Sequence, residues 1–127
     1  MVREAQDNLT RQGYECRVEG IFWHTGENDT YFGPYAQNYS KWMKQLIDRA
    51  RLDLKLPDLT WYISEQHKDA PWGNMDMVNA GLNEMSVSDR QITIIRTSHL
   101  PHGPHHFGTT GTLLLGEEMA NAYLKQP

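Results

Sequence analysis

Three short apolar segments along the chain have the pattern of buried strands. They are Cys16–His24, Leu59–Ser64 and Ile92–Ile95. The first contains the cluster Ile21-Phe22-Trp23, in which apolar residues follow one another without strict polar alternation. Because that pattern is typical of strands covered on both faces, it predicts a sheet that lies between layers of helix.

The segments around these strands carry apolar residues at helical spacing. We expect helices at Val2–Gln12, from Tyr39 to Leu54, at Met75–Met85 and at Thr109–Lys125. The residues expected to face inward are Trp42, Met43, Leu46, Ile47, Ala50 and Leu54 in the second helix, Met75, Val78, Leu82 and Met85 in the third, and Leu113, Leu114, Met119, Ala120 and Tyr123 in the last. Polar loops are expected at Gly26–Asn38, Gln66–Asn74 and Thr97–Gly108.

The predicted order alternates helices with strands from one end of the chain to the other. Such alternation implies right-handed crossovers and a parallel sheet. A chain of 127 residues suits one domain, and no linker or repeat divides it. The predicted fold class is therefore α/β, a single domain over residues 1–127 with about three parallel strands flanked by helices.

Composition and charge exclude several partners. The net charge of -4 argues against binding to a nucleic-acid backbone, and no apolar run approaches the length of a membrane span. The single cysteine, Cys16, excludes an intrachain disulfide, and the polar residues Met1–Asn8 do not form a signal peptide. We therefore expect a soluble, cytoplasmic protein by default.

A polar turn directly follows the first predicted strand. It contains Gly26, Glu27, Asn28 and Asp29. Ligands of open α/β sheets gather at the carboxyl ends of the strands, and an asparagine amide there can stabilise the oxyanion of acyl transfer. The alternative is that Asn28 and Asp29 merely close and cap a turn.

Four histidines follow the third predicted strand. They are His99, His102, His105 and His106, and the Pro and Gly residues between them give metal ligands no fixed face. A single catalytic imidazole, acting as a general base, accounts for the loop more simply than a metal site does. A solvated loop without chemistry is the other interpretation. We expect no metal and no cofactor, since no phosphate-binding or dinucleotide-binding glycine motif is present.

Aromatic residues are concentrated after the polar turn. Tyr31, Phe32 and Tyr35 lie close together, and Trp72 follows the second strand. Such rings stack on sugars at the mouth of a pocket, or they simply cover the sheet.

Together these features resemble the SGNH-hydrolase superfamily, and in it the sialate O-acetylesterase-like branch of carbohydrate acetylesterases. The branch has a pattern like G-v-x-W-x-Q-G-E-x-D, which is matched here by Gly20–Asp29. Further matches are Tyr39, Leu46, Ile47, Arg51, Thr97, Leu100, His106-Phe107, Gly111, Leu115-Gly116 and Met119-Ala120. The resemblance covers about Tyr14 to Leu124.

The resemblance implies a fold and a set of site residues. The fold would be a partial flavodoxin-like three-layer sandwich. Gly26 and Asn28 would form the oxyanion hole and His106 would be the general base. Glu27 and Asp29 of the polar turn and Tyr31 and Tyr35 of the aromatic segment are the residues that we expect to contact an acetylated carbohydrate.

The chain departs from the family pattern at three places. Thr25 replaces a glutamine, and Gly103 replaces the aspartate that orients the family's histidine, which leaves His102, Glu27 or Asp29 for that task. The family's nucleophilic serine lies after an N-terminal strand that has no counterpart here. Ser40, Ser64, Ser86, Ser88 and Ser98 are all in other sequence contexts.

The absent strand predicts an unpaired sheet edge at Cys16–His24. An open edge flanked by large apolar residues pairs readily with another chain, so we expect a homodimer or a partner that supplies a strand. The leading hypothesis is a truncated or divergent carbohydrate acetylesterase module, inactive or weakly active alone. The alternatives are a non-catalytic glycan-binding or assembly protein on the same scaffold, and metal binding through the four histidines.

Overall fold

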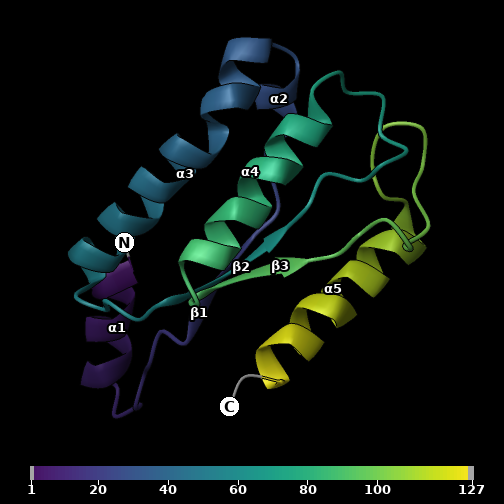
Figure 1. Ribbon diagram of the computed structural model, residues 1–127. Coiled ribbons are helices and arrows are strands. Elements are labelled where there is room, and N and C mark those ends of the chain that lie inside the picture. The colour runs from purple at the N-terminus through teal and green to yellow at the C-terminus, as the bar shows by residue number, and fades with distance from the viewer. Residues whose placement is uncertain (1, 126–127) are drawn as a thin grey trace.

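The chain folds into a three-stranded parallel sheet with helices on both faces (Figure 1). This computed structural model describes residues 2–125, and Met1, Gln126 and Pro127 lie outside the described residues. The elements, in chain order, are α1 (Val2–Arg11), β1 (Gly20–Trp23), α2 (Glu27–Thr30), α3 (Gly33–Leu54), β2 (Thr60–Ser64), α4 (Met75–Ser88), β3 (Ile92–Ile95) and α5 (Thr109–Leu124). The predicted α/β architecture is confirmed.

The strands lie in the order β1-β2-β3, and both neighbouring pairs are parallel. Trp23 pairs with Ile63 at the end of β1, and Ser64 pairs with Ile95 at the end of β2. Parallel strands bring their carboxyl ends to one edge of the sheet. The chain segments that leave the three strands therefore begin side by side.

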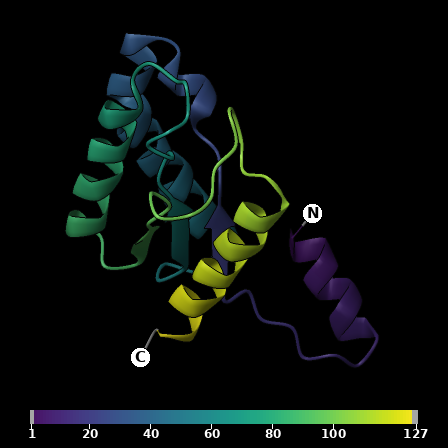
Figure 2. The same cartoon turned by 90° about the vertical axis from the view of Figure 1, so that its right-hand side faces the viewer.

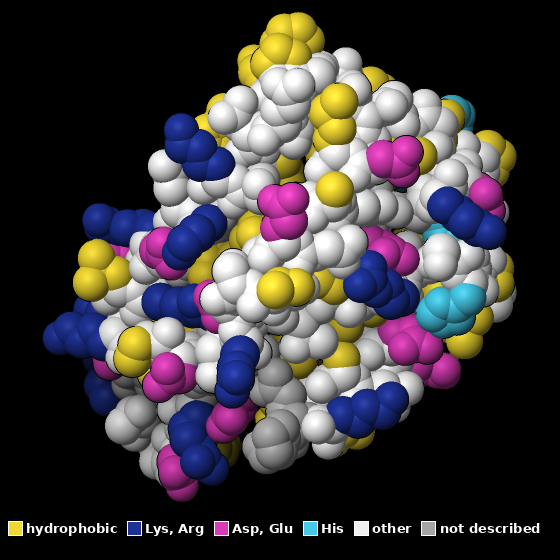
Figure 3. Space-filling model, in the orientation of Figure 1, with side chains coloured by type: hydrophobic (Ala, Val, Ile, Leu, Met, Phe, Trp, Pro, Cys, Tyr) yellow, Lys and Arg dark blue, Asp and Glu magenta, His cyan; other side chains and the backbone are white. Residues whose placement is uncertain are grey.

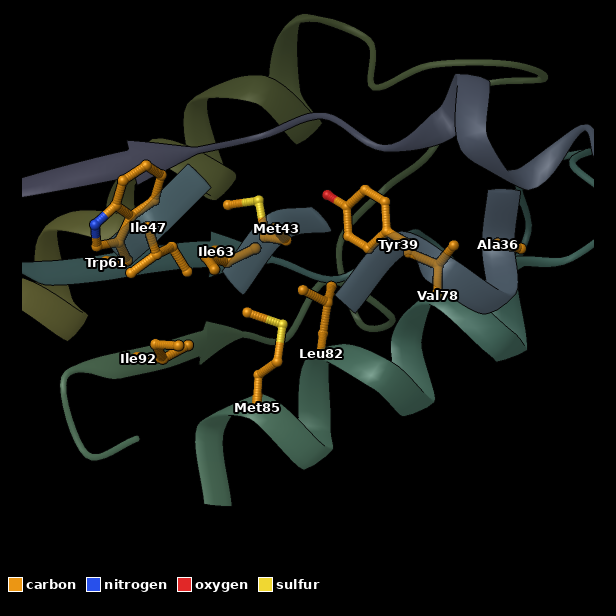
Figure 4. Packing of buried hydrophobic residues seen from close by; sticks show 10 residues of the cluster. All are labelled: Ala36, Tyr39, Met43, Ile47, Trp61, Ile63, Val78, Leu82, Met85 and Ile92. Carbon is orange, nitrogen blue, oxygen red and sulfur yellow. The ribbon is translucent and has the colours of Figure 1, made fainter. Parts of the chain in front are cut away.

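Two apolar clusters hold the helices to the sheet. On one face, residues of α3 and α4 pack with Trp61 and Ile63 of β2, as Figure 4 shows. On the other face, Tyr62 and Leu115 join β2 to α5. The side chains of β2 are buried throughout, which agrees with a strand covered on both sides.

Arg51 ties together three elements at the opposite edge of the sheet. Its Nε and Nη2 each donate a hydrogen bond to the Leu59 carbonyl at 3.1 Å, and its Nη1 donates to Asp89 at 2.6 Å. Burial alone would raise the pKa of Asp89, but the hydrogen bonds from Arg51 and from the Gln91 N–H outweigh burial and hold this pKa below its usual value. The end of α3, the start of β2 and the end of α4 are thereby fixed to one another.

Helix α1 lies at the periphery of the fold (Figure 2), where Arg3 donates a hydrogen bond to the Asp53 carbonyl near the end of α3. None of its residues is buried. The segment that joins it to β1 carries Arg17 between Glu15 and Glu19 in exposed ion pairs.

The predicted strand Cys16–His24 is longer at both ends than β1, which spans Gly20–Trp23. Pairing begins only at Gly20, because β2 itself begins at Thr60, its partner.

The expected loop Gly26–Asn38 is wrong, since it contains α2 and the start of α3. Helix α3 begins at Gly33, where Pro34 occupies the first turn. Proline fits that position because its fixed φ is already helical and its missing N–H would have no partner there. The aromatic segment therefore begins a helix.

Several residues expected to face inward are exposed. In α3 the buried stripe is Ala36, Tyr39, Met43 and Ile47, and Trp42 and Leu46 lie beside it, 43% and 41% exposed. In α5 the buried positions are Gly111 and Leu115; Leu114 and Met119 are partly buried and pack against the same cluster as expected, whereas Leu113, Ala120 and Tyr123 are exposed. Both helices present a narrower apolar face to the sheet than the sequence pattern indicates. The prediction for α4 is confirmed at Val78, Leu82 and Met85.

The surface mixes charges of both signs. Figure 3 shows lysine and arginine side chains interspersed with aspartate and glutamate, and histidines on the side where Figure 1 shows the loops after β2 and β3. None of the helices formed by residues 2–125 is both long and apolar enough to cross a bilayer.

Candidate active site

A pocket of about 240 Å³ lies at the carboxyl ends of the strands. Its walls come from the segments after β1 and β2, the loop after β3 and the first turns of α5. The lining residues are His24, Glu27, Glu65, Gln66, His67, Trp72, His102, His106, Phe107, Thr112 and Leu115. This volume lies below the range of about 300–1,000 Å³ that is typical of pockets for drug-sized ligands.

Two buried side chains, those of Tyr39 and Gln66, hold the turn between β1 and α2 in place. Gly26 has φ +134°, and a Cβ at this position would lie 2.9 Å from Tyr39 Oη and 3.0 Å from Gln66 Nε2. Tyr39 Oη and Gln66 Nε2 both donate hydrogen bonds to the Thr25 carbonyl, at 3.0 and 3.3 Å. Burial raises the pKa of Tyr39, so this phenol stays protonated and keeps its hydrogen bond. Only glycine fits this turn.

His24 is the first residue after β1, and it turns toward β2. Its Nδ1 lies 2.5 Å from Ser64 Oγ, and its ring lies against Phe107 with centroids 5.7 Å apart. Burial lowers the pKa of His24; Glu27 opposes this shift, and His106 and His102 add to it. The imidazole therefore favours its neutral form.

His67 follows β2 and holds the loop after β3. It is 2% exposed; its Nε2 donates to the Leu100 carbonyl at 3.1 Å and its Nδ1 accepts from the Asp69 N–H at 3.1 Å. These partners assign the neutral tautomer with the proton on Nε2. The ring stacks on His102, with centroids 4.3 Å apart and planes 6° apart. Burial lowers the pKa of His67, and the nearby His102 lowers it further.

His106 lies at the mouth of the pocket, on a loop that packs against α5. Its carbonyl accepts a hydrogen bond from the Gly103 N–H at 2.9 Å, and its ring lies 5.6 Å from Trp72. Gly111 permits the close approach of α5, because a Cβ there would overlap the Pro101 carbonyl and lie 2.8 Å from Phe107 Cδ1. The imidazole is exposed, and neither of its ring nitrogens has a hydrogen-bond partner among residues 2–125.

The structure brings together some of the predicted site residues and not others. Glu27 and His106 line the same pocket, and Gly26 is buried beside it. The other predicted residues are absent from this lining within the described chain: Asn28, Asp29, Tyr31 and Tyr35. Asn28 is exposed on α2, and Tyr31 and Tyr35 are 66% and 50% exposed. The roles assigned to all these residues stay predictions.

Sequence reasoning missed two histidines of the pocket. His24 and His67 each lie just beyond the end of a strand. Polar residues at the carboxyl ends of parallel strands are the signal that could have found them.

The four histidines after β3 do not converge on one point, because their side chains have different neighbours. His99 Nε2 lies 3.3 Å from Glu118 Oε1, whereas His102 stacks on His67. No group of three or more His, Cys, Asp or Glu side chains within residues 2–125 is arranged to hold a metal ion.

Replacing Gly111 by alanine tests the packing of the loop that carries His106. We expect Gly111→Ala to lower the free energy of unfolding by about 2 kcal/mol, because the added methyl group overpacks the contact with Pro101 and Phe107. Urea unfolding followed by tryptophan fluorescence measures this change.

Gly116→Ala on the same helix is the matched control, since a Cβ there has open space. It should be neutral or stabilising by up to about 1 kcal/mol, as alanine favours a helix over glycine. Equal stability of the two variants would contradict the close contact at Gly111.

Comparison with known proteins gives a family and a structural neighbour. The family model described as "Carbohydrate esterase, sialic acid-specific acetylesterase" matches residues 1–125. A protein from Arabidopsis thaliana, whose X-ray structure was determined at 1.6 Å resolution, is similar with a TM-score of 0.79 and 25% sequence identity. No curated protein matches the sequence significantly.

The match to the Arabidopsis protein covers 98% of this chain and 52% of that one, so the chain spans about half the length of its neighbour. This likeness is consistent with the predicted partial flavodoxin-like arrangement. With the family model matched over nearly all of its residues, the chain belongs to the sialic acid-specific acetylesterase family of carbohydrate esterases.

Proposed function

We propose that the pocket is the acyl-binding part of a carbohydrate O-acetylesterase site in which His106 is the general base. The observation that carries the proposal is the position of His106. Its exposed imidazole lines the same pocket as Glu27 and His24, at the carboxyl edge of the sheet, in a chain of an esterase family. An accessible imidazole without a partner is suited to moving a proton between a hydroxyl nucleophile and a leaving sugar oxygen.

The proposed reaction is acyl transfer through a serine ester. His106 takes the proton of a serine hydroxyl as its oxygen attacks the acetyl carbonyl, and a tetrahedral oxyanion forms. Collapse of this intermediate breaks the bond to the sugar oxygen, which receives the proton from His106. Water then releases acetate by the same sequence. Gly26 and Asn28 remain the proposed oxyanion residues, as the family resemblance implies.

The nucleophile is proposed to come from another strand. Ser64 is fully buried against His24, and Ser86 and Ser88 donate to the Asn83 and Met85 carbonyls of their own helix. Among the described residues, no serine forms a hydrogen bond with His106. We therefore propose that a segment bearing the serine adds to the open edge of β1.

Two observations support this edge as the point of addition. Within residues 2–125, β1 pairs only with β2, and Phe22 on β1 is 50% exposed although it stacks on Tyr62 at 4.9 Å. The Arabidopsis neighbour is also about twice as long as this chain. An open apolar edge is a template for a further strand, supplied by a second copy or by another polypeptide segment.

His106→Ala tests the role of the imidazole. We expect it to lower kcat/KM for 4-nitrophenyl acetate by about a hundredfold or more, because general-base catalysis contributes on that order. His105→Ala, an exposed neighbour outside the pocket lining, should stay within about twofold of the unchanged protein. Equal activity of the His106 variant and the unchanged protein would refute the assignment.

Light scattering at high protein concentration tests whether the open edge of β1 pairs with a second copy of the chain. We expect a species of twice the chain mass that Phe22→Lys converts to a monomer, since a charge beside β1 opposes pairing. Tyr31→Lys, which alters an exposed ring directly after α2, should leave the dimer intact. A monomer at every concentration would leave no support for self-pairing, and only a different polypeptide segment could then supply the strand.

A second candidate function is glycan binding without turnover. The rings of Phe32, Tyr35 and Trp42 form an exposed cluster, with centroids 5.0 Å apart for the first pair and 5.8 Å for the second. Exposed aromatic rings provide apolar faces on which sugar rings can stack. This cluster lies outside the pocket lining of the described chain, so it would act independently of His106.

Calorimetry with an O-acetylated sialoside separates the two candidates. If the cluster binds glycan, Tyr35→Ala weakens binding about tenfold, an effect on the scale of one stacking contact, while His106→Ala does not. Leu113→Ala, at an exposed position on α5, is the control. Binding that depends on His106 and not on Tyr35 would exclude the cluster as the main glycan site.

A further inference from the structure

The hydrogen bond between Ser64 and His24 fixes the position of a proton in the pocket. Ser64 is fully buried, and among residues 2–125 its hydroxyl has one recorded side-chain partner, His24 Nδ1 at 2.5 Å. A buried hydroxyl requires an acceptor for its proton, and an unprotonated Nδ1 is such an acceptor. If Nδ1 carried a proton, the Ser64 hydroxyl would be left buried without an acceptor. Ser64 therefore donates, and the ring proton of His24 resides on Nε2.

The second ring nitrogen of His24, Nε2, is available to a ligand. His24 lines the pocket, and its Nε2 has no hydrogen-bond partner among the described residues. Because Nδ1 is occupied by Ser64, Nε2 is the ring nitrogen of His24 that remains for a ligand. Burial lowers the pKa of His24, and the ionisable groups acting on it are Glu27, His106 and His102. At neutral pH the pocket therefore contains a neutral N–H donor in a fixed orientation.

We propose that His24, held by Ser64, is a catalytic residue that donates its Nε2–H to the carbonyl oxygen of the bound acyl group. The proposal rests on the function proposed above and adds a donor that the family resemblance does not supply. Asn28, the donor implied by the resemblance, is exposed outside the pocket lining, whereas His24 is part of it.

The donor acts where charge develops. As the nucleophile's oxygen forms its bond to the carbonyl carbon, the π electron pair moves onto the carbonyl oxygen, and the Nε2–H stabilises it there. The proton is shared and not transferred. On collapse the oxygen regains its double bond, and the leaving sugar oxygen takes the proton held by His106. A neutral imidazole suits this task because its orientation is set by Ser64 before substrate binds.

Long-range ¹H–¹⁵N NMR of protein labelled at histidine tests the tautomer directly. At pH 7.5 we expect the pattern of a neutral ring with its proton on Nε2 for His24, and a mixture of tautomers in Ser64→Ala. A proton on Nδ1 in the unchanged protein would overturn the proposal. This result is independent of any turnover, so it does not depend on whether His106 acts as a base.

Titration with sodium acetate, the product acid, tests the donor. We expect the His24 Nε2 signal to shift with acetate, and His24→Phe to weaken acetate binding about tenfold, on the scale of one hydrogen bond to a charged group. His99→Phe, whose imidazole lies beside Glu118, is the matched control and should leave binding unchanged. Acetate affinity unaffected by His24→Phe would overturn the proposal, even if His106→Ala abolished esterase activity.

Discussion

The parallel pairing of β1 with β2 is the constraint on which the site depends. The register that places Trp23 beside Ile63 makes His24 a neighbour of Ser64, 40 residues later in the chain. The pairing of β2 with β3 places the segment after β3 beside the segment after β2, where the Thr97 N–H donates to the Glu65 carboxylate at 2.9 Å. A shift of one residue in the first register would move His24 away from Ser64 and turn every β1 side chain to the other face.

Buried polar contacts then convert three strand ends into a pocket of fixed shape. Asn79 of α4 holds the backbone of Gln66 through two hydrogen bonds. The Asn79 side-chain oxygen accepts from the Gln66 N–H at 2.7 Å, and the Asn79 amide nitrogen donates to the Gln66 carbonyl at 2.9 Å. His67 binds the Leu100 carbonyl and so ties the loop after β2 to the loop after β3. These contacts fix the backbone after β2 and tie it to the loop after β3 before any ligand binds, whereas Nδ1 of His102, which also lines the pocket, is buried without a hydrogen-bond partner among the described residues.

The sequence was sufficient for the arrangement of the chain and for part of the site. The order of the strands and of every helix except α2, the parallel sheet and the meeting of His106 with the segment after β1 follow from apolar runs and from the rule for strand ends. The start of α3 was not predictable from the ring-rich composition near Pro34. The pair His24–Ser64 depends on strand register, a tertiary property that no local pattern encodes. The exposure of Asn28 likewise depends on how α2 packs against α3 and α4.

Aromatic NOESY spectra test most directly whether the segment after the carboxyl end of β1 and the loop after β3 line the same pocket. The structure predicts cross-peaks between the rings of His24 and Phe107, whose centroids are 5.7 Å apart, and between Trp72 and His106, at 5.6 Å. The stacked pair Phe22 and Tyr62, at 4.9 Å, reports that the sheet is intact. Cross-peaks for this last pair without those of the first two would show that the loop lies elsewhere and would contradict the account.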